Sequence, residues 1–333
     1  MPDHPTDPAE DRVSVAVHLD PSDWSDHLAE QTRRGLQADP PWIPPVWFYD
    51  EVGSKLFDQI TRLDEYYPTD AERSILRDRS ADIARLTGAP TLIELGSGTS
   101  EKTMLLLDAL AGAGTLRTVV PFDVSEEVLR SAARTIAATY PTVTVDAVVG
   151  DFHRHLDRLP TGDGALLAFL GSTIGNLDPD ERRGFLAGVR SALQPGDWFL
   201  LGTDLVKPVD RLLAAYDDAA GITAEFDLNA LDVMDRELDA DFDRARFVHR
   251  SHWDPVERRI EMHLVSTCEQ TVTVRGLDDL VVRLGEGDHL RTEISTKFTR
   301  DGVAAELADA GLETVEAWTD AAGDFLLTLA RRT

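Results

Sequence analysis

Residues that can hold a nucleotide-like cofactor follow a short apolar run at 91–95. Gly96-x-Gly98 comes directly after Glu94 and Leu95, and a helical pattern begins a few residues later. Glycines in this arrangement allow a tight turn and a close approach of the backbone to a ligand. Glu101 stands where a dinucleotide fingerprint has its third glycine, and its charge would repel a pyrophosphate. The turn therefore favours S-adenosylmethionine, which carries a sulfonium and an ammonium and no phosphate.

Two further strand ends carry acidic residues that suit the same ligand. Asp123 ends "VVPFDVS", where a carboxylate can accept both ribose hydroxyls, and Asp151 with Phe152 in "VVGDF" can meet the amino group and the face of adenine. Each carboxylate can instead cap the helix that follows it, and a lone Gly-x-Gly is commonly a structural turn. Their occurrence at three successive strand ends favours the cofactor interpretation.

The elements that must position these residues alternate between apolar strands and amphipathic helices. The expected strands are "TLIEL", "TVVPFDV", "VTVDAVVG", "ALLAFLGS" and "WFLLGTDL", and the expected helices are 100–112, 125–139 and 178–193. Apolar strands that alternate with helices predict a parallel sheet covered on both faces. A helix at 300–310 and the segments "LETVEAWTD" and "DFLLTLARR" then predict an antiparallel hairpin that closes the sheet. The fold class is therefore α/β with a Rossmann-like sheet.

The alternation is interrupted, which predicts an inserted region. We expect helices over 208–246, followed by antiparallel strands in "RIEMHLVSTCEQTVTV" and "DLVVRLGEGDHLRTEIS" with "GEGD" as a turn. The expected organisation is a mobile tail at 1–20, an N-terminal helical region at 21–88 that contributes to a substrate domain, a Rossmann-like domain at 89–207, an inserted α+β substrate-binding region at 208–298, and the last part of the sheet at 299–333.

Composition narrows the classes of partner. The 333 residues carry a formal net charge of −27, which disfavours contact with phosphate backbones and anionic lipid surfaces. Cys268 is the single cysteine, so no internal disulfide can form, and no signal-peptide or membrane-spanning pattern is found. We expect a cytoplasmic monomer that binds neither nucleic acid nor a membrane. Only four of the 33 basic residues are lysines, which we interpret as a compositional bias.

Longer motifs carry a resemblance to a known family. "WFYDEVGSKLFDQITRLDEYYPT", "ELGSGTSEKT", "FLGSTIGNL", "LLGTDLVK", "AYDDAAG" and "ISTKF" resemble the S-adenosylmethionine-dependent L-histidine N-alpha-methyltransferases of ergothioneine biosynthesis, over Trp47 to about Leu329. The resemblance implies a class I methyltransferase fold with a substrate domain. It also implies trimethylation of the alpha-amino group of L-histidine to hercynine, with S-adenosylmethionine as donor and no metal.

The resemblance also implies two sets of site residues. The family's cofactor contacts fall on Gly96, Lys102, Asp123, Asp151 and Phe152. Its histidine contacts fall on Tyr49, Tyr66, Asn176, Tyr216, Met262, Glu293 and Ser295, with Asn176 and Tyr49 as the catalytic pair. Taken singly, most of these positions would be core, turn or solvated strand residues. We assign function because they occur inside the matching motifs.

Methyl transfer explains why these residue types are suitable. Asn176 can hold the neutral amine through its side-chain oxygen, while the hydroxyls of Tyr49 and Tyr216 can donate to the substrate carboxylate. Glu293 can accept an imidazole N–H, and Ser295 can bond the other ring nitrogen. The residues show no strong base, so water or a tyrosine hydroxyl would take the proton.

Other interpretations stay open. The pairs His153-x-His155 and His249-x-x-His252 suggest a metal site, but neither has an evident third ligand, and we expect surface histidines and no metal. The acceptor can also be another amino acid or amine. A different class of protein, a non-catalytic module that senses S-adenosylmethionine or histidine, would keep the same fold.

Overall fold

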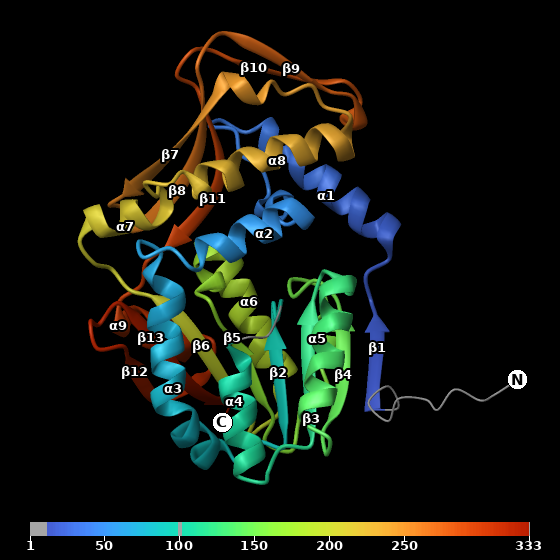
Figure 1. Ribbon diagram of the computed structural model, residues 1–333, viewed down its shortest axis with the longest axis vertical. Helices are drawn as coiled ribbons and strands as arrows, with labels where there is room; N and C mark the ends of the chain where they lie inside the picture. Colours follow the sequence, from blue (N-terminus) through green and yellow to red (C-terminus); the bar gives the residue numbers. More distant parts are fainter. Residues whose placement is uncertain (1–11, 99–101, 333) are drawn as a thin grey trace, which may run out of the picture. The chain divides into compact units, whose positions relative to one another are not determined.

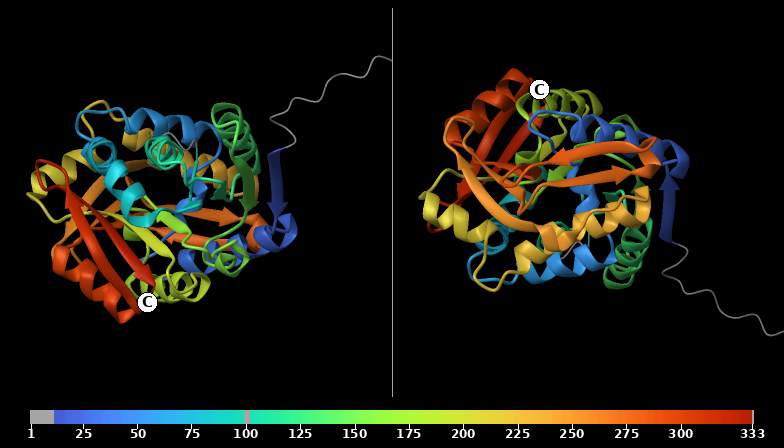
Figure 2. Two further views of the ribbon diagram at one scale, coloured as in Figure 1. Left: turned by 90° about the horizontal axis from the view of Figure 1, so that it is seen from below. Right: turned by 90° about the horizontal axis from the view of Figure 1, so that it is seen from above.

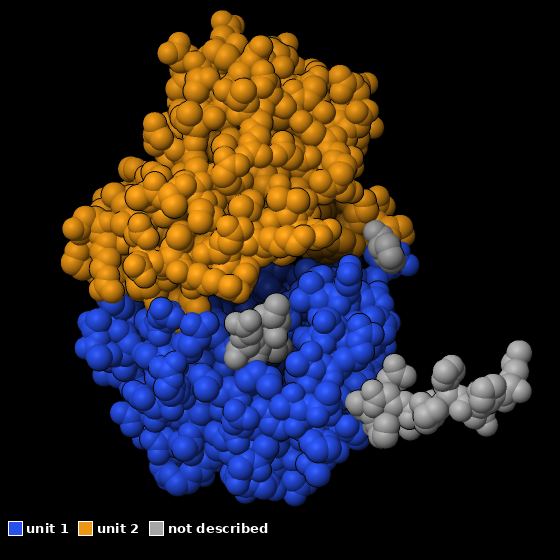
Figure 3. Space-filling view, in the orientation of Figure 1, with its two compact units in different colours: residues 1–20, 70–205, 298–333 blue, residues 21–69, 206–297 orange. Residues whose placement is uncertain are grey.

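The chain divides into two compact units, coloured separately in Figure 3. The computed structural model describes residues 12–98 and 102–332 (Figure 1). Unit 1 takes its described residues from the ranges Met1–Asp20, Asp70–Leu205 and Phe298–Thr333, and unit 2 comprises Pro21–Thr69 and Val206–Lys297. Each unit has its own hydrophobic core, so each is described by itself.

Unit 1 is built on a sheet with the strand order β1-β4-β3-β2-β5-β6-β13-β12. Its strands are β1 (Val13–Val17), β2 (Thr91–Leu95), β3 (Thr118–Asp123), β4 (Thr144–Val149), β5 (Leu166–Phe169), β6 (Trp198–Asp204), β12 (Leu312–Thr319) and β13 (Phe325–Arg332). Neighbouring strands from β1 to β6 are parallel, whereas β13 runs antiparallel to both β6 and β12. The sheet confirms the Rossmann-like α/β fold and the closing hairpin.

Helices cover both faces of this sheet because its strands are apolar on both sides. The helices are α3 (Tyr67–Thr87), α4 (Thr103–Gly112), α5 (Glu126–Thr139), α6 (Pro179–Ala192) and α9 (Arg300–Asp309). Leu92 of β2 packs into the core formed with α3, α4 and α5. Its neighbour Ile93 packs into the core formed with α6 and α9. Adjacent strand residues thus point to opposite helical layers.

The strand β1 corrects the expectation of a mobile tail over residues 1–20. Val13–Val17 pairs in parallel with β4, from Val13 opposite Val145 to Val17 opposite Val149. The strand lies at one edge of the sheet, as both views of Figure 2 show. The alternating "VSVAV" is half exposed there, as an edge strand with one buried face should be. Residues 1–11 lie outside the described part of the chain.

Helix α3 corrects the expected boundary at residue 88. From Asp70 onward its residues belong to unit 1, and Ile75, Leu76 and Ile83 are buried in the core beneath β2. The helix joins unit 1 because these apolar side chains face the sheet.

Unit 2 combines helices with two small antiparallel sheets. Its helices are α1 (Pro21–Leu36), α2 (Glu51–Ile60), α7 (Val209–Tyr216) and α8 (Ile222–Leu238). Its sheets have the orders β11-β8-β7 and β10-β9, formed by β7 (Phe247–Asp254), β8 (Arg259–Ser266), β9 (Gln270–Val274), β10 (Leu280–Leu284) and β11 (His289–Thr296). Strand β7 was not predicted from the sequence. The short 3-10 helices of unit 2 are η2 (Pro45–Phe48), η5 (Arg244–Arg246) and η6 (Arg275–Leu277). Those of unit 1 are η3 (Leu156–Arg158) and η4 (Thr173–Asn176).

Two kinds of feature are absent from the described residues. None of the helices in residues 12–98 and 102–332 combines the length and the apolar character needed to cross a membrane. In the same part of the chain, no three histidine, cysteine or carboxylate side chains gather as metal ligands do.

Candidate active site

The glycine turn after β2 has the backbone that the sequence predicts. Gly96 and Gly98 have φ values of 65° and 47°, a region that side chains with a Cβ rarely adopt. The N–H groups of Gly96 and Ser97 donate to the carbonyl of Phe122 in β3, at 2.8 and 3.1 Å. The turn is therefore bonded to the next strand. The prediction based on Glu101 falls on residues 99–101, which lie outside the described part of the chain.

The carboxylate of Asp123 links the ends of two strands. Its Oδ2 accepts from the N–H of Gly98 at 2.9 Å, and its Oδ1 accepts from the N–H of Ser125 at 3.0 Å. The second bond lies before α5 (Glu126–Thr139), whose N-cap is Ser125, so Asp123 does not cap this helix as the alternative interpretation expects. An ionised carboxylate has about four acceptor positions, so both oxygens can still accept from a ligand.

Asp151 and Phe152 lie after β4, as expected. Asp151 is buried, and its Oδ1 accepts from the N–H of His153 at 2.9 Å, so this oxygen caps the turn. The half-buried ring of Phe152 packs edge-on against Phe169 and Phe185, with centroids 5.3 and 5.7 Å away. Phe152 also lines a pocket of about 810 Å³ between its loop and helix α6.

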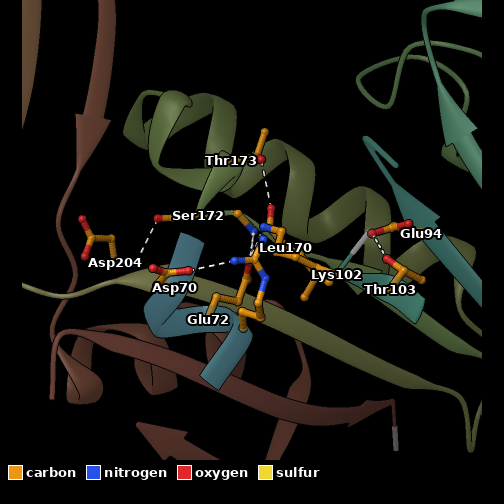
Figure 4. Close-up of polar contacts among 11 residues, drawn as sticks. Asp70, Glu72, Glu94, Lys102, Thr103, Leu170, Ser172, Thr173 and Asp204 are labelled. Atoms are coloured by element: carbon orange, nitrogen blue, oxygen red, sulfur yellow. Dashed lines mark hydrogen bonds and ion pairs between the residues drawn. The ribbon is translucent and has the colours of Figure 1, made fainter. Parts of the chain in front are cut away.

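Lys102 has a protein carboxylate as its partner. Its Nζ forms an ion pair with Oε2 of Glu72, a residue of α3 that is fully buried (Figure 4). The N–H of Gly171 donates to both oxygens of Glu72, at 2.9 and 3.0 Å. Glu72 therefore ties α3, the start of α4 and the turn after β5 together. About a quarter of the Lys102 side chain stays exposed, so its ammonium can also reach a ligand.

Asn176 ends the short helix η4 after β5. The left-handed positions of this turn are Gly171 (φ 76°) and Ser172 (φ 59°), and Asn176 is not one of them. Ser172 is held there by its Oγ, which accepts from the N–H of Asp204 at 2.9 Å (Figure 4). Asn176 itself is half-buried. This turn therefore fixes the position of η4 and of the backbone from which the Asn176 side chain extends.

The predicted tyrosines of unit 2 belong to one row of aromatic rings. Tyr49 contacts Phe57 with centroids 5.8 Å apart, Phe57 contacts Tyr66 at 6.3 Å, and Tyr66 contacts Tyr216 at 6.0 Å. These contacts are edge-to-face, one of the arrangements that aromatic pairs prefer. Tyr49 is 46% exposed, whereas Tyr216 is buried.

The predicted strand residues are brought together on β8 and β11. Glu293 lies directly opposite Met262, so their side chains are neighbours on one face of the sheet. Ser295 follows two residues later on that face, and its Oγ lies 2.8 Å from Oη of Tyr216. A bulge between Arg291 and Glu293 shifts the register just before this pair. Six of the seven predicted acceptor residues therefore lie in unit 2, and Asn176 lies in unit 1.

His249 is not the surface residue that its sequence context suggested. Its ring is buried between Oδ2 of Asp227 (2.6 Å from Nδ1) and the carbonyl of Tyr216 (2.8 Å from Nε2). Burial lowers the pKa of His249, but the hydrogen bond and charge of Asp227 outweigh this and the pKa is raised. A protonated ring donates from both nitrogens, one to Asp227 and the other to the carbonyl of Tyr216. The second bond fixes the backbone of Tyr216.

Sequence reasoning missed two site-supporting residues, Glu72 and Lys297. Glu72 lies in a helix with no motif of its own, 30 residues before Lys102. Lys297 is buried in the "ISTKF" motif and donates to Tyr216 and Ser295. The rarity of lysine in this chain was the one available signal for Lys297.

The residues of unit 1 fit an S-adenosylmethionine donor. Acidic oxygens of Asp123 and Asp151 suit ribose and adenine donors, and the ammonium of Lys102 suits a carboxylate. Ser97 Oγ, inside the glycine turn, is buried and lacks a hydrogen-bond partner among the described residues. A buried hydroxyl is normally bonded, so this atom is consistent with a ligand at the turn.

The chain matches a family model described as "Histidine-specific methyltransferase, SAM-dependent" over residues 28–332. It is 54% identical over 320 residues to the histidine N-alpha-methyltransferase of Mycolicibacterium smegmatis, covering 96% of this chain and 99% of the relative. The enzyme of the same name from Mycobacterium tuberculosis is 53% identical, covering 96% and 100%. Ergothioneine biosynthesis protein 1 of Neurospora crassa is 31% identical over 84% of this chain and 32% of its own length.

Proposed function

Because the chain belongs to the family of S-adenosylmethionine-dependent, histidine-specific methyltransferases, we propose that it trimethylates the alpha-amino group of L-histidine. The product is hercynine, and the reaction is the first step of ergothioneine biosynthesis. The observation that carries this proposal is the identity of 54% over nearly the whole length of a relative named for that activity. The contacts of the predicted residues support it.

The donor side of the proposal rests on unit 1. Asp123 would accept the ribose hydroxyls, Asp151 and Phe152 would take adenine, and Lys102 would bind the methionine carboxylate of S-adenosylmethionine. Gly96 has a φ of 65°, which residues with a Cβ rarely adopt. Because glycine has no side chain, the backbone of the turn can come close to the donor. The sulfonium supplies an electrophilic methyl group. No metal takes part, because the sulfonium already activates the methyl carbon.

The acceptor side rests mainly on unit 2. Tyr49 and Tyr66 would hold the substrate carboxylate, and Glu293 with Ser295 would bond the imidazole. Tyr216, whose Oη lies 2.8 Å from Ser295 Oγ, would act at the imidazole end. Met262, opposite Glu293, would pack against the ring. An apolar amino acid would leave the Glu293 carboxylate and the Ser295 hydroxyl without a hydrogen bond. In favourable cases such a site prefers the correct substrate by a factor of about 10⁴ in kcat/KM. The pocket would therefore prefer histidine to leucine or phenylalanine.

Asn176 would orient the reacting nitrogen. The amine must be neutral and in line with the methyl carbon, and its N–H groups can donate to the Asn176 side-chain oxygen. Orientation of this kind contributes on the order of 7–11 kcal/mol in favourable cases. Water or a tyrosine hydroxyl would help the proton loss that returns the amine to its neutral form before each methyl transfer. The net charge of −27 disfavours nucleic acids and membrane surfaces as partners and supports a small-molecule substrate. The proposal also includes a monomer in the cytoplasm.

Mass spectrometry of the product tests the function. Purified protein is incubated with S-adenosylmethionine and either L-histidine or each other amino acid, and we expect histidine-dependent mono-, di- and trimethyl products. Turnover of a different amino acid or amine, with none of histidine, would support another N-methyltransferase. Donor binding without turnover of any acceptor would support a sensor module.

Glu293→Ala tests the imidazole contact. We expect the KM for histidine to rise roughly 100-fold, because a charged hydrogen bond contributes about 1.5–3 kcal/mol. The affinity for S-adenosylhomocysteine should stay within about twofold by calorimetry. Glu286→Ala is the matched control, since Glu286 is exposed in the turn before β11. Parallel loss of both affinities in Glu293→Ala would contradict the assigned role.

A further inference from the structure

Lys297 is a buried lysine that the proposed function does not use. It directly follows β11, its side chain is 1% exposed, and its backbone N–H donates to the carbonyl of Arg258 at 2.7 Å. A buried ammonium is costly unless its protons are hydrogen-bonded. The partners of Lys297 therefore indicate what the side chain does.

Two of those partners are the hydroxyls of Tyr216 and Ser295. Nζ of Lys297 donates to Tyr216 Oη at 2.9 Å and to Ser295 Oγ at 2.8 Å, and the two oxygens lie 2.8 Å apart. The ammonium also lies 4.5 Å from the centroid of the Tyr216 ring. All three side chains belong to unit 2. They form a closed polar triad in which every pair is in contact.

The triad fixes the direction in which a hydroxyl proton points. An ammonium has only donors, so Lys297 occupies one lone pair on each hydroxyl oxygen. One hydroxyl then donates to the other, whichever of the two it is. The second hydroxyl proton is directed outside the triad. Seen from outside, the pair is therefore a donor.

We propose that Lys297 is a specificity-determining residue that makes the Tyr216–Ser295 pair donate to the unprotonated nitrogen of the substrate imidazole. This inference rests on the proposed function. Ser295 and Glu293 are two residues apart on β11 and share a face, so an accepting carboxylate and a donating hydroxyl are presented together. A neutral imidazole has one N–H and one bare nitrogen, which complement this pair.

The charge of Lys297 acts in the same direction. A protonated imidazole would bring a second cation toward the ammonium, and its two N–H groups would find only one acceptor. The ring of free histidine titrates near pH 6.5, so acidification removes the preferred form of the substrate. Titratable groups near the triad include Glu293 on β11 and His249 on β7, whose ring bonds the carbonyl of Tyr216 and the carboxylate of Asp227. These side chains are kept in the variant that replaces Lys297.

Steady-state kinetics of Lys297→Met at two pH values test the inference. At pH 8 we expect the KM for histidine to rise roughly 10- to 100-fold with a smaller change in kcat, because a charged hydrogen-bond donor is lost. The ratio of KM at pH 6 to KM at pH 8 should fall roughly three- to fivefold relative to the unaltered protein, since Ser295 can then accept from a protonated ring. Titration of the substrate amine is common to both proteins and cancels.

Lys55→Met is the matched control, because Lys55 is an exposed lysine of unit 2. Calorimetry with S-adenosylhomocysteine should give the same affinity for all three proteins. An unchanged KM ratio in folded Lys297→Met, or equal losses of histidine and S-adenosylhomocysteine binding, would overturn the inference. If circular dichroism shows that Lys297→Met does not fold, Lys297→Gln is measured instead, and a ratio equal to that of the unaltered protein would overturn it. Absence of histidine turnover in the unaltered protein would instead refute the proposed function.

Discussion

Lys102 in unit 1 and Lys297 in unit 2 are both largely hidden from solvent, but they have different neighbours. Lys102 contacts a fully buried carboxylate, Glu72, which also accepts twice from the backbone of Gly171. Lys297 donates to two hydroxyls, on Tyr216 and Ser295. One ammonium neutralises a buried charge, whereas the other directs protons.

The difference separates a stabilising role from a recognition role. Glu72 contacts three segments of unit 1, so its charge must be balanced for these segments to stay in place. A buried pair of this kind adds little compared with an apolar pair, but removal of one partner leaves an uncompensated charge. Lys297 instead donates to two neutral hydroxyls, and loss of this triad should mainly affect which substrate binds.

Removal of Lys102 should have the largest effect on stability. In Lys102→Met the carboxylate of Glu72, which is 0% exposed, loses its cationic partner, so we expect the free energy of unfolding to fall by about 3–5 kcal/mol. Denaturant unfolding followed by circular dichroism measures this. The double variant Glu72→Gln with Lys102→Met removes both charges and should recover most of the loss.

Lys55→Met is the control for this comparison. Lys55 pairs with Glu51 on the exposed face of α2, where both side chains are more than two thirds exposed. Its removal should change the unfolding free energy by less than about 0.5 kcal/mol. The role of the Glu72–Lys102 pair would be contradicted if Lys102→Met lowers the free energy of unfolding no more than Lys55→Met does. It would also be contradicted if the double variant recovers none of the lost stability.

The same double variant separates stability from donor binding. Glutamine at position 72 can still accept from Gly171, but no ammonium remains to meet the donor carboxylate. We therefore expect the affinity for S-adenosylhomocysteine to fall roughly 10- to 100-fold in a folded protein, from the loss of one charged hydrogen bond worth about 1.5–3 kcal/mol. Isothermal calorimetry measures it. An affinity within twofold of the unaltered protein would restrict Lys102 to a structural role.

Local patterns were enough to predict the strand ends of unit 1, whereas the donor contacts assigned to them stay a prediction. Gly96, Gly98 and Asp123 follow apolar strands directly, and parallel strands bring such ends to one edge of a sheet. The edge strand at 13–17 also had a readable alternation, which its acidic, proline-bearing surroundings obscured. Strand β7 was missed because "FVHRSHWD" is largely polar, although His249 is buried within it.

The supporting residues could not be predicted because their roles depend on distant contacts. Glu72 meets Gly171 across 99 residues of sequence, and Lys297 meets Tyr216 across 81. Neither distance leaves a periodicity or a spacing in the chain. The scarcity of lysine, which we interpreted as a compositional bias, was informative after all, since Lys102 is a predicted cofactor residue and Lys297 donates to two predicted site residues.

Removal of the carboxylate partner of the buried His249 should give the smallest effect and one that depends on pH. The pKa of His249 is raised in the folded protein, because the bond and charge of Asp227 outweigh desolvation. A raised folded pKa means that the stabilisation is fully present below the unfolded value near 6.5 and is lost as pH rises through the folded pKa. Asp227→Asn removes the charge, so it should cost about 1–2 kcal/mol at pH 6 and less at pH 9. Thermal unfolding at pH 6 and pH 9 measures the difference. An equal loss of stability at the two pH values would mean that the His249 ring is neutral at both, with one N–H for its two partners.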